Sequence, residues 1–317
     1  MVDELKIKQN TFSDLFTVHY IEMPDTRVFM HFQIQDNDIF YNSLYNYFFS
    51  NDNLIKYIKN KKGISFNPTL TQKIELYQHL QNYIDSENIQ IDITNYNEHI
   101  IAIIKDECET DEENSKIFAR KDKFGKIGEY IFCNILSNYY NFNCIIPKVH
   151  YITDNNMSVY GIDALFYSEQ DNLLLFGESK FCKNLGNGIS LINESLKNYQ
   201  SQIQEEYRII LSGQILKNCS SVFNEKFGDA RDSSYTVEEF ISKAGITKIG
   251  IPIFIAHGQE IDKNSIIKRL SNISQSTFFD LETIYYFISL PVINKDNLMK
   301  CFKTKINEKL REYKHVG

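Results

Sequence analysis

Two acidic residues and a lysine, Asp163, Glu178 and Lys180, have the types and the spacing to do chemistry together. Two apolar runs, at 160–167 and 173–181, flank a short polar stretch, and this pattern predicts two strands joined by a tight turn. Side chains alternate between the faces of a strand, so Glu178 and Lys180 share one face of the second strand. Asp163 lies on the first strand of the same hairpin.

The second strand is apolar on both faces away from its charged end, which indicates that it is covered on both sides. Burying carboxylates and an ammonium there is costly unless they are paired or bind a cation. Mg²⁺, or Mn²⁺ in its place, prefers oxygen ligands, so we expect Asp163 and Glu178 to bind the metal. Lys180 would then orient or deprotonate an attacking water, or stabilise charge that develops on a phosphate. The alternative is an ordinary ion pair on a surface strand, worth under about 1 kcal/mol.

The pattern of Asp163 followed by Glu178-Ser179-Lys180 resembles the PD-(D/E)xK nuclease superfamily. The resemblance implies metal-dependent hydrolysis of phosphodiester bonds. A helix is predicted at 126–139, ahead of the hairpin, and Glu129 in its first turn corresponds to a glutamate that many of these enzymes direct at the metal. Complementing the helix dipole is a simpler role for Glu129.

The resemblance also implies an α/β fold over residues 116–317, a restriction-endonuclease-like mixed sheet flanked by helices. Residues 1–115 are predicted to form a separate α+β module. The acidic run at 106–113 is interpreted as the linker between the two domains, with a DNA-mimicking or autoinhibitory segment as the alternative. We expect the N-terminal module to dock a partner, because it contains no catalytic spacing.

Periodicity and composition predict the remaining elements. In the N-terminal module we expect strands at 16–23, 27–35, 89–93 and 99–104 and helices at 38–49, 53–61 and 71–85. In the C-terminal domain we expect strands at 143–151 and 247–256, a loop at 185–188 and helices at 189–205, 237–243 and 299–314. The segment 207–227 fits either a helix or a strand followed by a helix.

The chain is acidic overall, with a net charge of −7 over 317 residues, and its 43% apolar content predicts a folded protein. Such a chain does not coat nucleic acid by bulk attraction, but a nuclease needs only a local basic surface. No stretch has the length and apolarity of a membrane span or a secretory signal, so we expect a cytoplasmic protein that does not bind membranes. The candidates for phosphate contacts, each alternatively part of a solvated basic face, are Lys121, Lys123, Lys126 and Lys148.

A closer resemblance covers most of the chain. The segments GKIGE, IPK, GIDALF and GESKF are similar to the HamA family, the nuclease subunits of bacterial Hachiman anti-phage defence systems. The resemblance implies degradation of DNA without sequence specificity, and a superfamily 2 helicase, HamB, that restrains the nuclease until damaged or phage-derived DNA is sensed. It also implies catalytic roles for Asp163, Glu178 and Lys180, with Glu129 helping to hold the metal. We assign the docking of HamB to the N-terminal module by elimination.

Two alternatives stay open. A non-catalytic subunit with a nuclease fold would couple the helicase to DNA, although it would have no use for the intact set of Asp163, Glu178 and Lys180. Cleavage of RNA, or of one nucleic-acid strand only, is not separated by the sequence either, because a metal site that contacts the backbone has no evident recognition of the 2′-hydroxyl.

Overall fold

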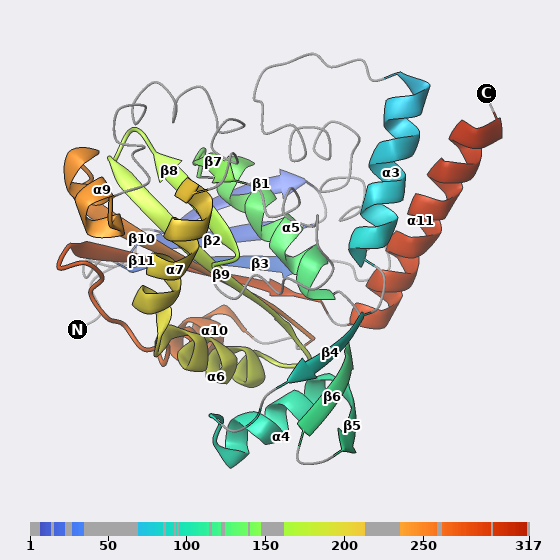
Figure 1. Cartoon of the computed structure of the whole chain (residues 1–317), viewed down its shortest axis with the longest axis horizontal. Helices are drawn as coiled ribbons and strands as arrows, with labels where there is room; N and C mark the ends of the chain where they lie inside the picture. The colour runs from blue at the N-terminus through green and yellow to red at the C-terminus, as the bar shows by residue number, and fades with distance from the viewer. Residues whose placement is uncertain are drawn as a thin grey trace.

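The chain folds around a large mixed sheet with helices on both faces, which is the α/β architecture expected from the sequence (Figure 1). Among the described helices, none is both long enough and apolar enough to cross a membrane. The computed structural model describes residues 7–13, 16–22, 27–34, 69–84, 87–91, 93, 95–113, 116–121, 124–138, 140–146, 162–212, 235–258, 262–292 and 294–315.

Parallel strands form the centre of the large sheet. β10 is buried along its length from Ile249 to His257, so residues on both of its faces are covered. Burial on both faces is typical of parallel strands that lie between two layers of helices. The parallel strands, in their order across the sheet, are β3 (Arg27–Ile34), β11 (Glu282–Pro291), β10 (Lys248–His257) and β9 (Leu173–Cys182).

Antiparallel strands extend the sheet at both edges. Beyond β9 lie β8 (Ala164–Ser168) and β7 (Asn143–Ile146), and beyond β3 lie β2 (Phe16–Glu22) and β1 (Ile7–Ser13). The N-terminal strands are therefore hydrogen-bonded into the same sheet as the predicted hairpin, across the boundary expected at residue 115. The hairpin itself is confirmed, since β8 and β9 pair antiparallel.

The alternation of side chains divides the apolar residues of the sheet into two clusters. In β10, Phe254 and Ala256 belong to one cluster, whereas Ile253 and Ile255 belong to the other. The first face is covered by α5 (Phe124–Asn138), and α3 (Leu70–Ile84) and α11 (Lys295–His315) add residues to the same cluster. The second is covered by α6 (Leu185–Leu196), α7 (Tyr199–Ser212), α9 (Val237–Lys243) and α10 (Lys263–Leu270).

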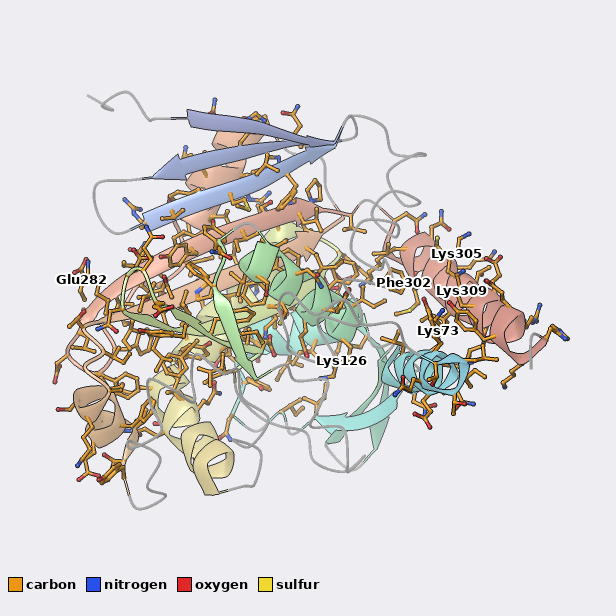
Figure 2. The ribbon with its side chains drawn as sticks, turned by 90° about the horizontal axis from the view of Figure 1, so that it is seen from above. Lys73, Lys126, Glu282, Phe302, Lys305 and Lys309 are labelled. Atoms are coloured by element: carbon orange, nitrogen blue, oxygen red, sulfur yellow. The ribbon has the colours of Figure 1, made fainter. Side chains whose placement is uncertain are left out.

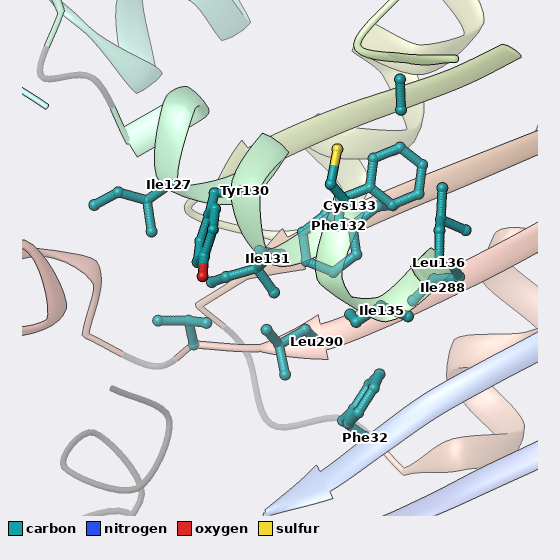
Figure 3. Packing of buried hydrophobic residues seen from close by; sticks show 14 of the residues in the cluster. Phe32, Ile127, Tyr130, Ile131, Phe132, Cys133, Ile135, Leu136, Ile288 and Leu290 are labelled. Carbon is teal, nitrogen blue, oxygen red and sulfur yellow. The ribbon is translucent and has the colours of Figure 1, made fainter. Parts of the chain in front are cut away.

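Helix α5 lies across the first face of the sheet. Ile127, Ile131 and Ile135 repeat every four residues, and all three are buried. Figure 3 shows Ile131 and Ile135 directed toward Leu290 and Ile288 of β11. The apolar stripe of the helix is therefore used to pack it onto the sheet.

A second, three-stranded antiparallel sheet has the order β4-β6-β5, and α4 (Glu98–Glu107) precedes β5 in the chain. Its strands are β4 (Glu87–Ile91), β5 (Glu109–Glu113) and β6 (Lys116–Lys121). The interpretation of 106–113 as a linker is wrong, because these residues end α4 and form β5. The boundary expected at residue 115 thus falls between strands that pair with each other.

The strand predicted at 99–104 is also wrong, because these residues lie inside α4. The side chain of Asn97 accepts a hydrogen bond from the Ile100 nitrogen and caps the helix. An apolar run of this length fits a buried helix as well as a strand, so periodicity alone could not separate the two.

Most other described elements agree with the predicted ones within a few residues, but the prediction at 185–205 is wrong in two respects. The predicted loop at 185–188 is the first turn of α6, because the Asn184 side chain accepts from the Asn187 nitrogen. The single helix predicted at 189–205 is two helices, α6 and α7. Strands β1, β5, β6 and β11 and helix α10 were not predicted. The helices predicted at 38–49 and 53–61 lie outside the described residues, as does most of 207–227.

Candidate active site

A glycine in β9 lets α5 approach the strand closely. A Cβ added at Gly177 would lie 2.7 Å from Cε1 of the Phe132 ring, so a larger residue requires the ring to move. At the start of α5, a Cβ at Gly128 would lie at an ordinary 3.6 Å from the Cβ of Phe181. These contacts place the N-terminal half of α5, which contains Glu129, beside the end of β9.

Asp163 directly precedes β8 and is bonded to β9 through both its backbone and its side chain. Its backbone nitrogen donates to the Gly177 carbonyl at 2.8 Å. Its Oδ2 atom accepts from the backbone nitrogen of Ser179 at 2.7 Å and from the Ser179 hydroxyl at 2.9 Å. The hairpin therefore brings Asp163 against the residue that separates Glu178 from Lys180.

Glu178 and Lys180 lie on the face of β9 that α6 covers. They pair in register with Ile253 and Ile255 of β10, which belong to the same apolar cluster as α6. Glu178 is only 3% exposed, and its Oε1 atom accepts a short hydrogen bond from Lys180 Nζ. The Lys180 side chain is 25% exposed, whereas the side chain of Glu178 is 4% exposed.

Opposing influences act on the pKa of Lys180. Burial lowers the pKa of the ammonium, but attraction to Glu178 and Asp163, together with the hydrogen bond to Glu178, outweighs burial and raises the pKa above the usual value for lysine. Both carboxylates are therefore close enough to act on one ammonium. The three side chains together carry one net negative charge.

The donor set of this site fits a hard divalent cation. Mg²⁺ in proteins is commonly held by one or two carboxylates, while waters and substrate phosphates fill its other positions. Asp163 and Glu178 supply two such carboxylates around the same ammonium. Among the described residues, no group of three or more His, Cys, Asp or Glu side chains is arranged to hold a metal ion, so Glu129 does not complete a three-carboxylate cluster.

Glu129 is buried in α5 and is bonded to Lys126 one turn earlier. The Lys126 ammonium lies 3.2 Å from Glu129 Oε1 and 3.3 Å from Oε2. The lysine predicted to contact phosphate and the glutamate predicted to help hold metal thus contact each other. Lys121 ends β6, and Lys123 and Lys148 lie outside the described residues.

Ser179 and Gly177 are site residues that sequence reasoning missed. Ser179 holds Asp163 in place, and Gly177 admits α5 to the strand. A glycine inside a strand is a recognised sign of close approach by another part of the chain, so Gly177 carried a signal that could have been used. The serine hydroxyl had no such signal, because its partner comes from the neighbouring strand.

Glu107 at the end of α4 is a second residue that the sequence did not reveal. Its carboxylate accepts from the Lys183 backbone nitrogen, with both oxygens at 2.9 Å, and from the Asn187 amide at 2.8 Å. Lys295 of α11 adds an ion pair at 3.2 Å. One carboxylate thus joins α4, α11 and the connection between β9 and α6. This connection begins shortly after Lys180 in the chain.

Comparison with known proteins identifies the family of the chain. Neither a search of curated proteins nor a search of solved structures found a match. The family model described as HamA matches residues 37–306, which include α5, the β8–β9 hairpin and most of α11. The chain therefore belongs to the HamA family, whose members have a role in Hachiman anti-phage defence.

Proposed function

We propose that the chain is a metal-dependent nuclease that hydrolyses DNA without sequence specificity, as the effector of a Hachiman defence system. The observation that supports this best is the double hydrogen bond from Ser179 to Asp163. It fixes one carboxylate beside a strand that also presents a second carboxylate, Glu178, and an ammonium, Lys180. A binding subunit without catalysis has no need for this arrangement.

Each side chain has a distinct role in the proposed reaction. Asp163 and Glu178 would hold the metal, whereas Glu129 forms an ion pair with Lys126 on α5. When bound, the metal polarises a phosphoryl oxygen and lowers the pKa of a bound water. The Lys180 ammonium donates a hydrogen bond to the attacking water or to a phosphate oxygen, where it offsets negative charge.

Contacts to the nucleic acid in this proposal are limited to its backbone. Phosphate contacts position a substrate but read no sequence, so cleavage would be unspecific and sensitive to salt. Lys121, Lys123, Lys126 and Lys148 are the proposed contacts. The proposed partner is the superfamily 2 helicase HamB, docked on residues 1–115 and controlling access of DNA to the site.

The test is a cleavage assay on the purified full chain, with and without the helicase, on supercoiled and linear DNA in Mg²⁺ or EDTA. We expect degradation in Mg²⁺ that EDTA abolishes. Degradation only in the presence of the helicase would show that the partner controls the nuclease. If DNA stays intact under all of these conditions while the chain still binds it, the protein is a DNA-binding subunit and the proposal is wrong.

A further inference from the structure

Helix α11 is strongly basic in an acidic chain. It contains seven Lys or Arg residues against three Asp or Glu, whereas the whole chain contains 34 against 41. The helix also contributes to the core, because Leu298, Phe302, Ile306 and Leu310 are buried along one side of it. Positive charge is thus concentrated on the remaining surface of one well-anchored helix.

The α11 helix lies beside α3, and the pair projects from the side of the sheet (Figures 1 and 2). The Tyr77 and Tyr313 rings pack with their centroids 5.7 Å apart. Gln81 of α3 donates a hydrogen bond to Asn307 of α11 at 3.0 Å. These contacts fix α11 in place without using its exposed basic residues.

One flank of α11 has its charges neutralised within the helix. Lys305 lies 3.4 Å from Glu308, and Lys309 lies 2.8 Å from Glu312. Such pairs, three residues apart on a helix surface, are common and of little energetic consequence. Lys305 and Lys309 are therefore not an unbalanced patch of charge.

The other flank of α11 carries four basic residues. Lys300, Lys303, Arg311 and Lys314 fall within roughly 80° of the helix circumference and extend over about 21 Å of its length. Lys300, Arg311 and Lys314 are exposed. Within the part of the chain that the structure describes, none of these three forms an ion pair with an acidic residue. We call these four residues the basic flank.

The helix dipole does not account for the basic flank. Cations near a helix C-terminus are stabilised by the dipole, which covers Lys314 in the last turn. Lys300 and Lys303, however, lie in the N-terminal half of α11, outside the last turn where the dipole stabilises positive charge. Their clustering is therefore an arrangement that suits an anionic ligand.

We propose that the basic flank binds the phosphate backbone of nucleic acid, as a handhold for the DNA outside the catalytic site. This inference rests on the proposed nuclease function. Residues three or four apart are about 5–6 Å apart along and across a helix, so the flank can contact successive phosphates along one strand. It reads no bases, and it supplies the local positive surface that an acidic chain needs to hold a polyanion.

The test measures binding and cleavage separately. Full-length chain with Glu178→Gln is titrated into a short fluorescein-labelled DNA duplex, and anisotropy gives Kd at several salt concentrations. Lys300→Gln with Arg311→Gln should weaken Kd about tenfold or more near 0.1 M salt and reduce the salt slope by about 2. Lys305→Gln with Lys309→Gln removes the same charge from the paired flank and should change Kd by less than about twofold. Thermal unfolding confirms that both double variants are folded.

The outcomes separate this inference from the proposed function. Equal loss of affinity in the two double variants, or no binding of the duplex at all, would overturn the handhold. If only association with an acidic protein partner such as the helicase falls, the flank is a protein interface and the handhold is also wrong. Flank-dependent binding without any cleavage by the wild-type chain would support the handhold and contradict the nuclease. If the variant with Lys300→Gln and Arg311→Gln cleaves DNA as fast as the wild-type chain, the nuclease function is supported and the handhold is contradicted.

Discussion

Ser179 donates two hydrogen bonds to the carboxylate of Asp163, one from its backbone nitrogen and one from its hydroxyl. Ser179 lies between Glu178 and Lys180 and points to the opposite face of β9, because side chains alternate along a strand. Glu178 and Lys180 therefore lie on one face of β9. Asp163 is held by the backbone of the strand and by the Ser179 side chain on the other face.

The two partners of this contact should differ in their effect on cleavage. Asp163→Asn removes the charge that would hold the metal, so we expect loss of DNA cleavage by at least about 100-fold. Ser179→Ala removes one hydrogen bond and leaves the backbone bond, so we expect a loss of about tenfold or less. Initial rates of plasmid nicking measure both. A larger effect of Ser179→Ala than of Asp163→Asn would contradict the assigned roles.

Gly177→Ala should destabilise the fold. The new Cβ would lie within 2.8 Å of the Phe132 ring, and overpacking of this kind costs about 1–3 kcal/mol. Adding Phe132→Leu should restore part of the loss, because it removes the ring. Gly128→Ala is the matched control: its Cβ meets only an ordinary contact inside a helix, so it should be neutral or stabilising by about 0.5–1 kcal/mol. Urea unfolding measures all three, and equal losses at both glycines would rule out the close contact.

The hairpin and the helix ahead of it could be predicted because their signals are local. The polar stretch 168–172 between two apolar runs, and the four-residue repeat of Ile127, Ile131 and Ile135, do not depend on distant residues. Other contacts join segments that are distant in the sequence, so no local pattern predicts them. Examples are the pairing of β3 with β11 and the bond between Glu107 and Lys183. The strand prediction for residues 99–104 failed for a different reason. An apolar run fits either a strand or a helix, and only the cap at Asn97 decides between the two.

Glu107→Gln should lower the free energy of unfolding by about 2 kcal/mol. The carboxylate is 9% exposed and accepts from Lys183, Asn187 and Lys295, and hydrogen bonds to a buried charge are worth about 1.5–3 kcal/mol. Glu312→Gln, at an exposed ion pair with Lys309, should change stability by less than about 0.5 kcal/mol. Chemical denaturation measures the free energy of unfolding of both variants. Similar losses in the two variants would show that the contacts of Glu107 do not stabilise the fold.

The free energy of unfolding should decrease as the pH is lowered, because of His31. Burial and the neighbouring His19 lower the pKa of His31, a hydrogen bond to the backbone of Ser289 raises it, and the result is a pKa of about 4 in the folded chain. The unfolded chain takes up this proton near pH 6.5 and the folded chain does not, so stability is present above about pH 6.5 and is lost toward pH 4. One such histidine accounts for about 3 kcal/mol. Urea unfolding of wild type and His31→Gln from pH 7 to pH 4.5 measures it, and parallel pH curves would show that His31 does not contribute.

The rate of DNA cleavage by matched variants of two Glu–Lys pairs tests the central claim most directly. Glu178→Gln and Lys180→Gln alter the buried pair of β9, and Glu194→Gln and Lys197→Gln alter an ion pair on α6, where Lys197 is 57% exposed. With Mg²⁺, and with the helicase present if cleavage needs it, we expect the β9 variants to lose at least about 100-fold in rate. The α6 variants should stay within about twofold of wild type. Cleavage that survives Glu178→Gln and Lys180→Gln as well as it survives the α6 changes would contradict the assignment of the active site.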